Sequence, residues 1–569
     1  MSLRVPPYLH APSSTGVSIV WFSSTAEPGT LTVTGPHAPG PITSVPEELE
    51  HLRYTDAERA QTIPGLEPGS WLRPGRNLRH VVVLRGLRPG TEYAYTLDQG
   101  GETVSAGFRT APAAEDWTHL RLVALADSEA APAGRSRRRP WAPGPGAEHR
   151  PDPEGPWREA FGVDAGTGPH GRRQPVLRYP LTEGEGFRAV TDLIAADRPD
   201  LILHPGDLVG GGGYQPAWDE YFAITSRHGL LGRTPLLPAM GNWESFGALN
   251  GGYGTAQDRR PVVRARSKYH AYFPGPPDAV TGPRGYYRVD YGPLTILTLD
   301  SSNGEPDDHP ARYPDPVGGR DYRGPGTDTQ QHFTRTEYEQ AGGADLSDIH
   351  PGGVQWRWVE ENLRQARARR QIVLVQFHHI PYSSGAHGLP MDHEDTTGQG
   401  GTPMRRFHPL FRRYGVIAVL CGHSELFERS VVPDDGGSPP GRDVASVRSR
   451  DGVLYYDVGV AGDSLGGEQR YGNELLRYNP YRVWTADQDE PERWRIAANG
   501  NPVLAEGGKH YGYLCIDVRR TGAEVWIRFE PVHAFPVLDQ DYRLQQIQRR
   551  AYTDVVEIPI GPDGRAGSQ

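Results

Sequence analysis

Five apolar segments of this chain end in side chains that can bind a metal ion or transfer a proton. Each segment is short and unbroken and runs into a polar turn, which is the pattern of a strand buried on both faces. The side chains at these ends are Asp127 with Glu129, Asp207, Asn242, His378 with His379, and His423 with Glu425. All of them offer oxygen or imidazole donors.

The segment from Arg198 to Gly210, RPDLILHPGDLVG, shows why such ends should meet. Its apolar run follows a Pro-Asp turn signal and ends at Asp207. Ligands of an open α/β sheet lie beyond the carboxyl ends of its strands, so Asp207 is expected at the reactive edge. A Gly-Asp turn explains one such residue, but five strand ends in register are not explained as turns alone.

Carboxylates gathered on one rim repel one another unless a cation lies between them. Mixed carboxylate, amide and imidazole ligands suit Mn, Fe or Zn. Two metals that share a bridging carboxylate suit hydrolysis of phosphoesters. The residue types therefore predict a metal-dependent hydrolytic site.

Helices and strands alternate around these ends, which predicts a mostly parallel α/β unit. A helix is expected just before Pro199, and a second one over residues 353–366. Residues 285–302 look like a hairpin. The expected inner faces of the two helices are Phe187, Val190, Leu193 and Ile194 in the first, and Val354, Trp358, Val359 and Leu363 in the second.

Residues 1–113 are expected to form a separate all-β domain without chemistry, and residues 114–569 the catalytic domain. The run from Leu87 to Tyr93, with its Pro-Gly corner, resembles the tyrosine corner of a fibronectin type III sandwich. Two stretches without periodicity, at about 130–180 and 303–353, are expected to be long insertions over the strand ends. The basic run RSRRR, residues 135–139, either meets an anionic substrate or is a solvated loop.

The bulk composition excludes some classes. A net charge of −10 over 569 residues argues against a nucleic-acid footprint. No window of about 18 apolar residues predicts a membrane span. The start MSLRVPPYLH lacks an apolar signal core, so a cytoplasmic protein is expected, or an exported one if the chain is a mature or trimmed form. Cys421 and Cys515 lie in apolar strand patterns and are expected to be buried free thiols. The oligomeric state is left open.

The order Asp, GD, GN, HH, GH, in GDLV, GNWE, HHIPYSS and GHSE, resembles the calcineurin-like metallophosphoesterase superfamily. With the front domain, the chain is similar to the purple acid phosphatase branch. The resemblance implies a fibronectin III-like β-sandwich followed by an α/β domain of two packed mixed sheets flanked by helices. It also implies two divalent metal ions and a small anionic phosphoester substrate.

The resemblance also implies roles for single residues. Asp207 would bridge both metals, and Asp127 would bind one of them. The other metal would take Asn242, His378 and His423. His378 is chosen because it keeps the trailing Tyr-Ser-Ser in step with the family, and His379 stays an alternative. His387 resembles the substrate-side histidine of the branch.

Three departures from the family pattern change the expected chemistry. Glu129 and Glu425 stand where the family has histidines, which makes one metal position all-carboxylate and favours Mn, Mg or Ca there. The alternative is that one glutamate points away and the position is weak or empty. Trp243 replaces a histidine and cannot transfer a proton, so His379 or His387 would act as the acid, or none is needed. Its ring could stack on the substrate.

A further departure is Gly210, which stands where the purple enzymes have a tyrosine, so no tyrosinate–iron colour is expected. The hypothesis favoured by these patterns is a phosphodiesterase or phosphatase in which a metal-bound hydroxide attacks phosphorus. Two alternatives remain. One is a catalytically weakened metal-binding or scaffold protein, and the other is a dinuclear-metal enzyme with non-phosphoester chemistry.

Overall fold

The computed structural model of the chain describes residues 2–144, 147–167, 173–275, 284–302, 333–347, 349, 351–387, 401–433, 452–468, 470–471, 474–475 and 479–567. Most of the expected insertion at 303–353 lies outside the described residues.

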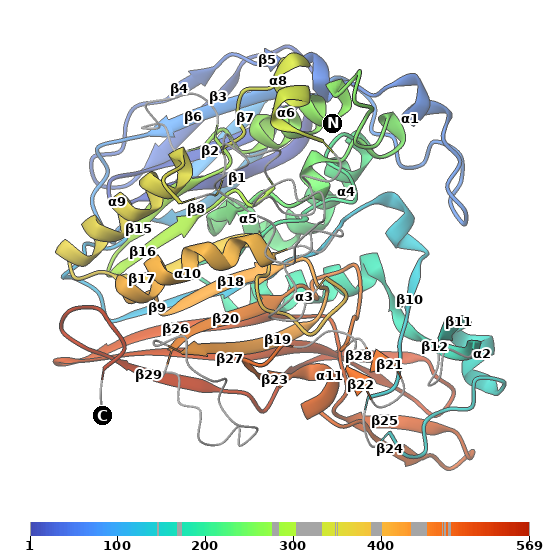
Figure 1. Cartoon of the computed structure of the whole chain (residues 1–569). Helices are drawn as coiled ribbons and strands as arrows, with labels where there is room; N and C mark the ends of the chain where they lie inside the picture. The colour runs from blue at the N-terminus through green and yellow to red at the C-terminus, as the bar shows by residue number, and fades with distance from the viewer. Residues whose placement is uncertain are drawn as a thin grey trace.

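Two mixed sheets pack face to face and carry the five strand ends (Figure 1). In the larger sheet the neighbouring strands β9 (His119–Ala124), β13 (Leu201–His204) and β14 (Leu236–Pro238) run parallel. In the second sheet β16 (Leu294–Thr298), β17 (Ile372–His379), β18 (Ala418–Gly422) and β20 (Gly452–Val458) do the same. The strands expected at all five positions are thus confirmed.

A continuous apolar layer fills the space between the sheets. Leu122, Leu203 and Leu237 of the larger sheet lie in one buried cluster with Leu374 and Leu420 of the second. Because parallel strands are buried on both faces, each sheet needs a helical layer outside it. The domain therefore has four layers, with helices on both sides of the two sheets.

The outer face of the larger sheet is covered by α3 (Glu183–Asp197) and α4 (Gln215–Thr225). Phe187, Val190 and Ile194 of α3 are buried, as expected, and Leu193 is half-buried. The helix begins with a capping box, in which Thr182 and Glu185 satisfy each other's backbone N–H groups. It ends before Pro199, which cannot continue a helix without losing a hydrogen bond.

The second sheet is covered by α9 (Val354–Ala368) and α10 (His408–Arg413), which lie over β17 and β18 in Figure 1. Val359 and Leu363 of α9 are buried as expected. The expectation for Val354 is wrong, because this side chain is 42% exposed. Val354 is the first residue of the helix, and the inward-facing residue of this turn is instead the fully buried Gln355, whose Oε1 accepts from Asp300 N at 2.8 Å. The hairpin of β15 (Tyr287–Tyr291) with β16 is confirmed.

The N-terminal strands form two facing sheets. β1 (Leu3–Ser13), β2 (Gly16–Ser23) and β6 (Leu78–Leu84) pair antiparallel, and β3 (Gly29–Thr34), β7 (Glu92–Gln99) and β8 (Glu102–Arg109) form the opposite sheet. The Tyr93 hydroxyl accepts a hydrogen bond from Arg88 N (2.9 Å), which is the contact of a tyrosine corner. Membership of the fibronectin type III class stays a prediction.

The N-terminal sheet that contains β1 continues directly into the strands β14, β13 and β9. β1 pairs in parallel with β14, with His10 opposite Leu236. Tyr8 of β1 lies in the same buried cluster as Phe222 of α4. The first strands thus share a core with the domain that carries the site.

Where the structure describes the stretch at 130–180, it forms regular elements that its lack of periodicity did not indicate. It forms the small sheet β10 (Arg138–Pro140), β12 (Arg173–Thr182) and β11 (Val163–Thr167), with α2 (Pro156–Phe161) beside it. Trp141 and Trp157 stack 6.0 Å apart in its core. Isolated aromatic residues carry this packing, so helical or strand periodicity gives no signal for it.

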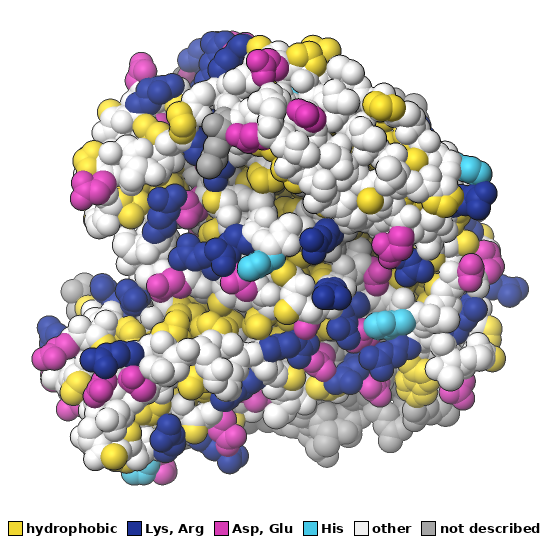
Figure 2. Space-filling model, turned by 180° about the vertical axis from the view of Figure 1, so that it is seen from behind, with side chains coloured by type: hydrophobic (Ala, Val, Ile, Leu, Met, Phe, Trp, Pro, Cys, Tyr) yellow, Lys and Arg dark blue, Asp and Glu magenta, His cyan; other side chains and the backbone are white. Residues whose placement is uncertain are grey.

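The C-terminal strands β26 (Gly512–Thr521) and β27 (Glu524–Leu538) extend the larger sheet on the far side of β9. Both cysteines are buried and free, as expected. Among the described residues no helix is both long and apolar enough to cross a membrane. Basic and acidic side chains are interspersed on the face shown in Figure 2.

Candidate metal centre

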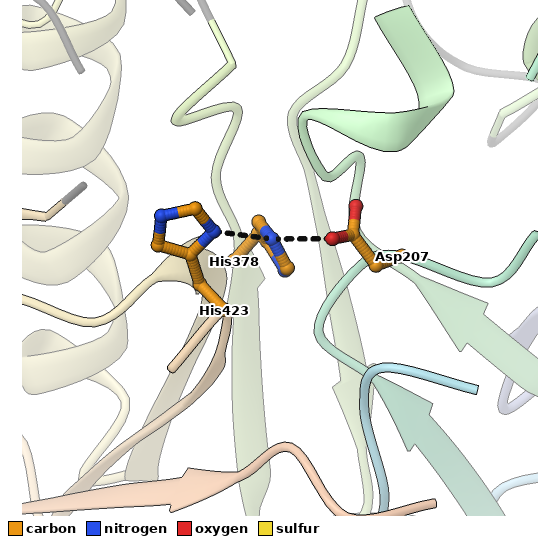
Figure 3. A group of neighbouring side chains, drawn as sticks. All are labelled: Asp207, His378 and His423. Atoms are coloured by element: carbon orange, nitrogen blue, oxygen red, sulfur yellow. Dashed lines mark hydrogen bonds and ion pairs between the residues drawn. The ribbon is translucent and has the colours of Figure 1, made fainter. Parts of the chain in front are cut away.

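The two sheets bring the strand ends to one rim. The loops after β9, β13 and β14 carry Asp127, Asp207 and Asn242, while the second sheet supplies His378 at the end of β17 and His423 after β18. Neighbouring loops are tied together, because Glu129 N donates to the Asp207 carbonyl at 3.0 Å. Figure 3 shows Asp207, His378 and His423 pointing toward one another.

Four donor atoms at this rim have the mutual spacing of ligands around one ion. His378 Nε2 lies 2.8 Å from Asn242 Oδ1, 3.0 Å from Asp207 Oδ2 and 3.2 Å from His423 Nδ1. His423 Nδ1 lies 3.1 Å from Asn242 Oδ1. Bonds of about 2.1 Å to one metal at right angles place neighbouring ligand atoms about 3 Å apart. The spacing therefore fits a divalent cation.

The orientation of the His378 ring also indicates that it binds a cation. Its Nδ1 lies 3.0 Å from the Pro205 carbonyl, which can only accept, so Nδ1 carries the hydrogen. In the neutral ring Nε2 then presents a lone pair to Asn242 Oδ1 and Asp207 Oδ2, which are also acceptors. Acceptors facing one another at these distances need a proton on Nε2 or a metal cation between them. A backbone carbonyl that fixes the tautomer is typical of a metal-binding histidine.

Glycines next to the ligands leave the space that this packing needs. Gly206 has φ +95°, and a Cβ there would lie 2.6 Å from His378 Nδ1. A Cβ on Gly241 would lie 2.1 Å from Asp207 Oδ1. A side chain at either position would displace a ligand, which explains the GD and GN pairs.

Five of the rim residues have left-handed backbone conformations. Asp127, Glu129, Asp207, His423 and Glu425 have φ between +34° and +79°. Such conformations cost about 1–3 kcal/mol each in residues other than glycine, and they persist where surrounding contacts fix them. The strain turns these side chains sharply off their strand ends and toward the rim.

A second group of carboxylates lies beside the first. Oxygens of Glu129, Glu425 and Asp463 all lie within 4.8 Å of one another. Burial, and then the charges of Glu425, Asp207 and Asp127, raise the pKa of Glu129 well above its usual range. Burial also raises the pKa of Asp127, to which the charges of Asp207 and Glu425 contribute. A cation in this group would relieve the repulsion.

Asp463 is a site residue that the sequence patterns did not single out. It follows β20, whose run VLYYDV also ends in a Gly-containing turn before an aspartate. Its backbone N–H donates to the Asp127 carbonyl at 3.0 Å. The signal resembles the one at Asp207, an apolar strand followed by a Gly-Asp pair.

Glu244 is a second residue whose part was not foreseen. Its carboxylate accepts hydrogen bonds from the backbone N–H groups of Asp207 (3.0 Å), Leu208 (2.9 Å) and Gly241 (2.7 Å). Burial, and then the charge of Asp207, raise its pKa to about 8. Glu244 thus fixes the GD loop against the GN loop.

The three residues expected to act on the substrate occupy different places. His379 is fully buried, and its Nδ1 lies 2.8 Å from Ser301 Oγ. His387 is half-buried and packs on the His423 ring at 4.1 Å. Trp243 is half-buried, donates its backbone N–H to Asp207 Oδ1 (2.9 Å) and meets Phe246 edge-on. His387 and Trp243 therefore border the rim, whereas His379 lies behind it.

The basic run at residues 135–139 makes ion pairs within the chain, while Arg135 and Arg137 stay exposed. Arg135 pairs with Glu220, Arg137 with Glu183, and Arg138 with Glu185. Arg139 pairs with Glu183 and with Asp463, so its charge lies beside the carboxylate group.

Residues 184–424 match the family model described as calcineurin-like phosphoesterase. Two uncharacterized proteins of Mycobacterium tuberculosis are each 29% identical over 134 residues, which is 22% of this chain and 24% of theirs. The match thus spans about a quarter of the length of these curated relatives.

Two solved structures share the fold. A purple acid phosphatase from yellow lupin (Lupinus luteus) seeds has a TM-score of 0.53 and 15% identity, over 95% of this chain and 73% of that one. The structure of PhoD has a TM-score of 0.53 and 11% identity, over 98% and 90%. The central part of the chain is therefore similar to calcineurin-like phosphoesterases, and nearly the whole chain has the fold seen in a purple acid phosphatase and in PhoD.

Proposed function

We propose that this protein is a metal-dependent hydrolase of phosphoesters with two divalent ions at the rim. The observation that carries the proposal is the convergence of Asp207, Asn242, His378 and His423 donor atoms at 2.8–3.2 Å. These donors suit Mn, Fe or Zn, and the carboxylates of Asp127, Glu129 and Glu425 suit Mn, Mg or Ca. Two ions there would activate water and stabilise negative charge that develops on a phosphoryl group.

The residues around the ions have separate tasks in this proposal. Asp207 holds both positions together, since Oδ2 faces His378 and its charge acts on Glu129. The Trp243 ring provides an apolar wall against which an aromatic or sugar part of the substrate can stack. His387 is the candidate that borders the rim for donating a proton to a leaving group.

The proposal favours substrates with good leaving groups. Trp243 occupies a position where it cannot protonate a leaving oxygen. A phosphodiester or an aryl ester needs less protonation than an alkyl monoester. We therefore propose a phosphodiesterase or a phosphatase for activated esters rather than a general alkyl phosphatase.

The test is hydrolysis by Mn²⁺-loaded protein of bis(p-nitrophenyl) phosphate, p-nitrophenyl phosphate and glycerol phosphate. We expect turnover of the aryl esters and little turnover of the alkyl ester, with Asp207→Asn as the inactive control. Full metal loading without hydrolysis of any ester would contradict the proposal and favour a metal-binding scaffold.

A further inference from the structure

We propose that Asp463 is a ligand of the carboxylate metal position and that Arg139 is its resident counter-cation, which competes with a divalent ion. This inference rests on the proposed function, because it concerns the second of the two ions. It goes beyond that function by adding a ligand and a residue that controls the affinity.

The fold delivers Asp463 to the rim in the same way as the other candidate ligands. β20 runs parallel to β18, so the loop after it leaves from the same edge of the sheet. The loop is anchored on Asp127, whose carbonyl accepts from Gly462 N (3.3 Å) and Asp463 N (3.0 Å). The Asp463 side chain is only 5% exposed.

An independent observation points to a cation in this region. Asp127 Oδ1 is buried and accepts no hydrogen bond within the part of the chain that the structure describes. His378 Nδ1 lies 3.6 Å from this oxygen, but the hydrogen of Nδ1 is directed to the Pro205 carbonyl. A buried carboxylate oxygen without a donor costs about 1–3 kcal/mol, and a bound ion would remove this cost.

Arg139 is placed to neutralise the group in the absence of an ion. Its guanidinium pairs with the Asp463 carboxylate, and its Nε donates to the Asp463 carbonyl at 3.0 Å. Nε also lies 2.6 Å from Glu183 Oε1. Glu183 thus holds Arg139 at the edge of the site, so an ion can take the Asp463 carboxylate while Arg139 keeps one anionic partner.

The expected ligand is a hard divalent cation. Glu129, Glu425 and Asp463 offer only carboxylate oxygens, which Ca²⁺, Mg²⁺ and Mn²⁺ prefer, and their affinity rises with the number of ligand charges. A fixed guanidinium beside these oxygens repels the incoming ion at short range, where screening by solvent is incomplete. Asp463 and Arg139 should therefore change the affinity in opposite directions.

The experiment is calorimetric titration of the metal-depleted full chain with Ca²⁺, which has little affinity for imidazole and so reports the carboxylate position. Asp463→Asn should weaken binding about tenfold or more, and Arg139→Gln should tighten it about tenfold. Arg138→Gln is the matched control, because it removes a neighbouring charge paired with Glu185 instead. Its affinity should stay within about twofold of wild type.

Arg139→Gln removes one charged partner of the buried Glu183, which could destabilise the fold. The double variant Arg139→Gln with Glu183→Gln avoids this, because it removes the Glu183 charge as well. The double variant should also bind Ca²⁺ more tightly than wild type. Unchanged affinity in Asp463→Asn, weaker affinity in both Arg139 variants, or no Ca²⁺ binding by wild type would overturn the inference. Ester hydrolysis is measured separately. The opposite changes in Ca²⁺ affinity of the Asp463 and Arg139 variants can be observed even if the protein hydrolyses no ester, so failure of the proposed function is distinguishable from failure of this inference.

Discussion

Replacing Asp207 by Asn should make the metal-free protein more stable while abolishing its response to metal. The substitution keeps the shape of the side chain. Its φ of +52° is also tolerated by Asn, so the backbone pays little. The amide oxygen can still accept from Trp243 N, as Asp207 Oδ1 does at 2.9 Å. The amide nitrogen then takes the place of Oδ2, 3.0 Å from His378 Nε2.

The sign of the effect follows from the partners. When His378 is neutral, two acceptors face each other at this distance in wild type, whereas in the variant an N–H donates to the His378 lone pair. The new hydrogen bond contributes about 1 kcal/mol, and the relief of an unpaired acceptor contributes up to ~2 kcal/mol more. Unfolding entropies of about 2.1 cal/mol/K per residue give ~1.2 kcal/mol/K for 569 residues. The midpoint should thus rise by about 1–2.5 °C.

Metal binding should raise the unfolding midpoint of wild type but not that of the variant. At an ion concentration of about 100 times Kd, a bound ion stabilises wild type by ~2.7 kcal/mol, or about 2 °C on the same scale. The variant should show no such shift. The assay is thermal unfolding of both proteins with and without Mn²⁺, with metal content by elemental analysis. A less stable metal-free variant, or one that keeps both ions, would refute the reasoning.

Further predictions follow from the other residues. His378→Ala should empty one metal position and leave the fold intact, whereas His379→Ala should change the Ser301 contact but not the metal content; the reverse result would show that the register through HHIPYSS is off by one. The raised pKa values of Asp127 and Glu129 mean that the folded, metal-free protein binds protons more tightly than the unfolded chain. This proton binding stabilises the fold fully below about pH 4, the usual pKa of these groups. The stabilisation is lost as pH rises through the raised values. Metal must displace these protons, so the metal-induced rise in midpoint should grow with pH, and a rise that shrinks with pH would contradict this. Removal of residues 1–113 should cause aggregation, since it exposes the β14 edge and its buried neighbours, and a soluble, metal-binding remainder would show that the catalytic sheet needs no N-terminal strand.

The strands that carry the site were predictable because their apolar runs are continuous. A run such as Leu201–Leu203 can be buried only between two layers, and the polar residue after it must then lie at the sheet edge. The helices were predictable for a related reason, since Phe187, Val190 and Ile194 repeat at helical spacing. Val354 deviates because the polar Gln355, which bonds to the Asp300 backbone, takes the inner face of the first turn, and an apolar pattern does not reveal such a contact.

The fold of the 130–180 stretch, the position of Asp463 and the partners of the basic run depend on contacts between distant segments. The periodicity of a sequence does not reveal such contacts. The 130–180 stretch is fixed by Trp141 and Trp157, which pack with residues far along the chain such as Trp494. Asp463 carries the same Gly-Asp signal as Asp207, but only the parallel pairing of β20 with β18 puts it at the same rim. The partners of the basic run, including Glu183, likewise come from other elements.

Anomalous diffraction from crystals of Mn²⁺-loaded protein tests the central claim most directly. We predict one peak bonded to Asp207, Asn242, His378 and His423 and a second among Asp127, Glu129, Asp207, Glu425 and Asp463, with Asp207 contacting both ions. A single peak, or peaks that these residues do not coordinate, would contradict the two-ion account of this site.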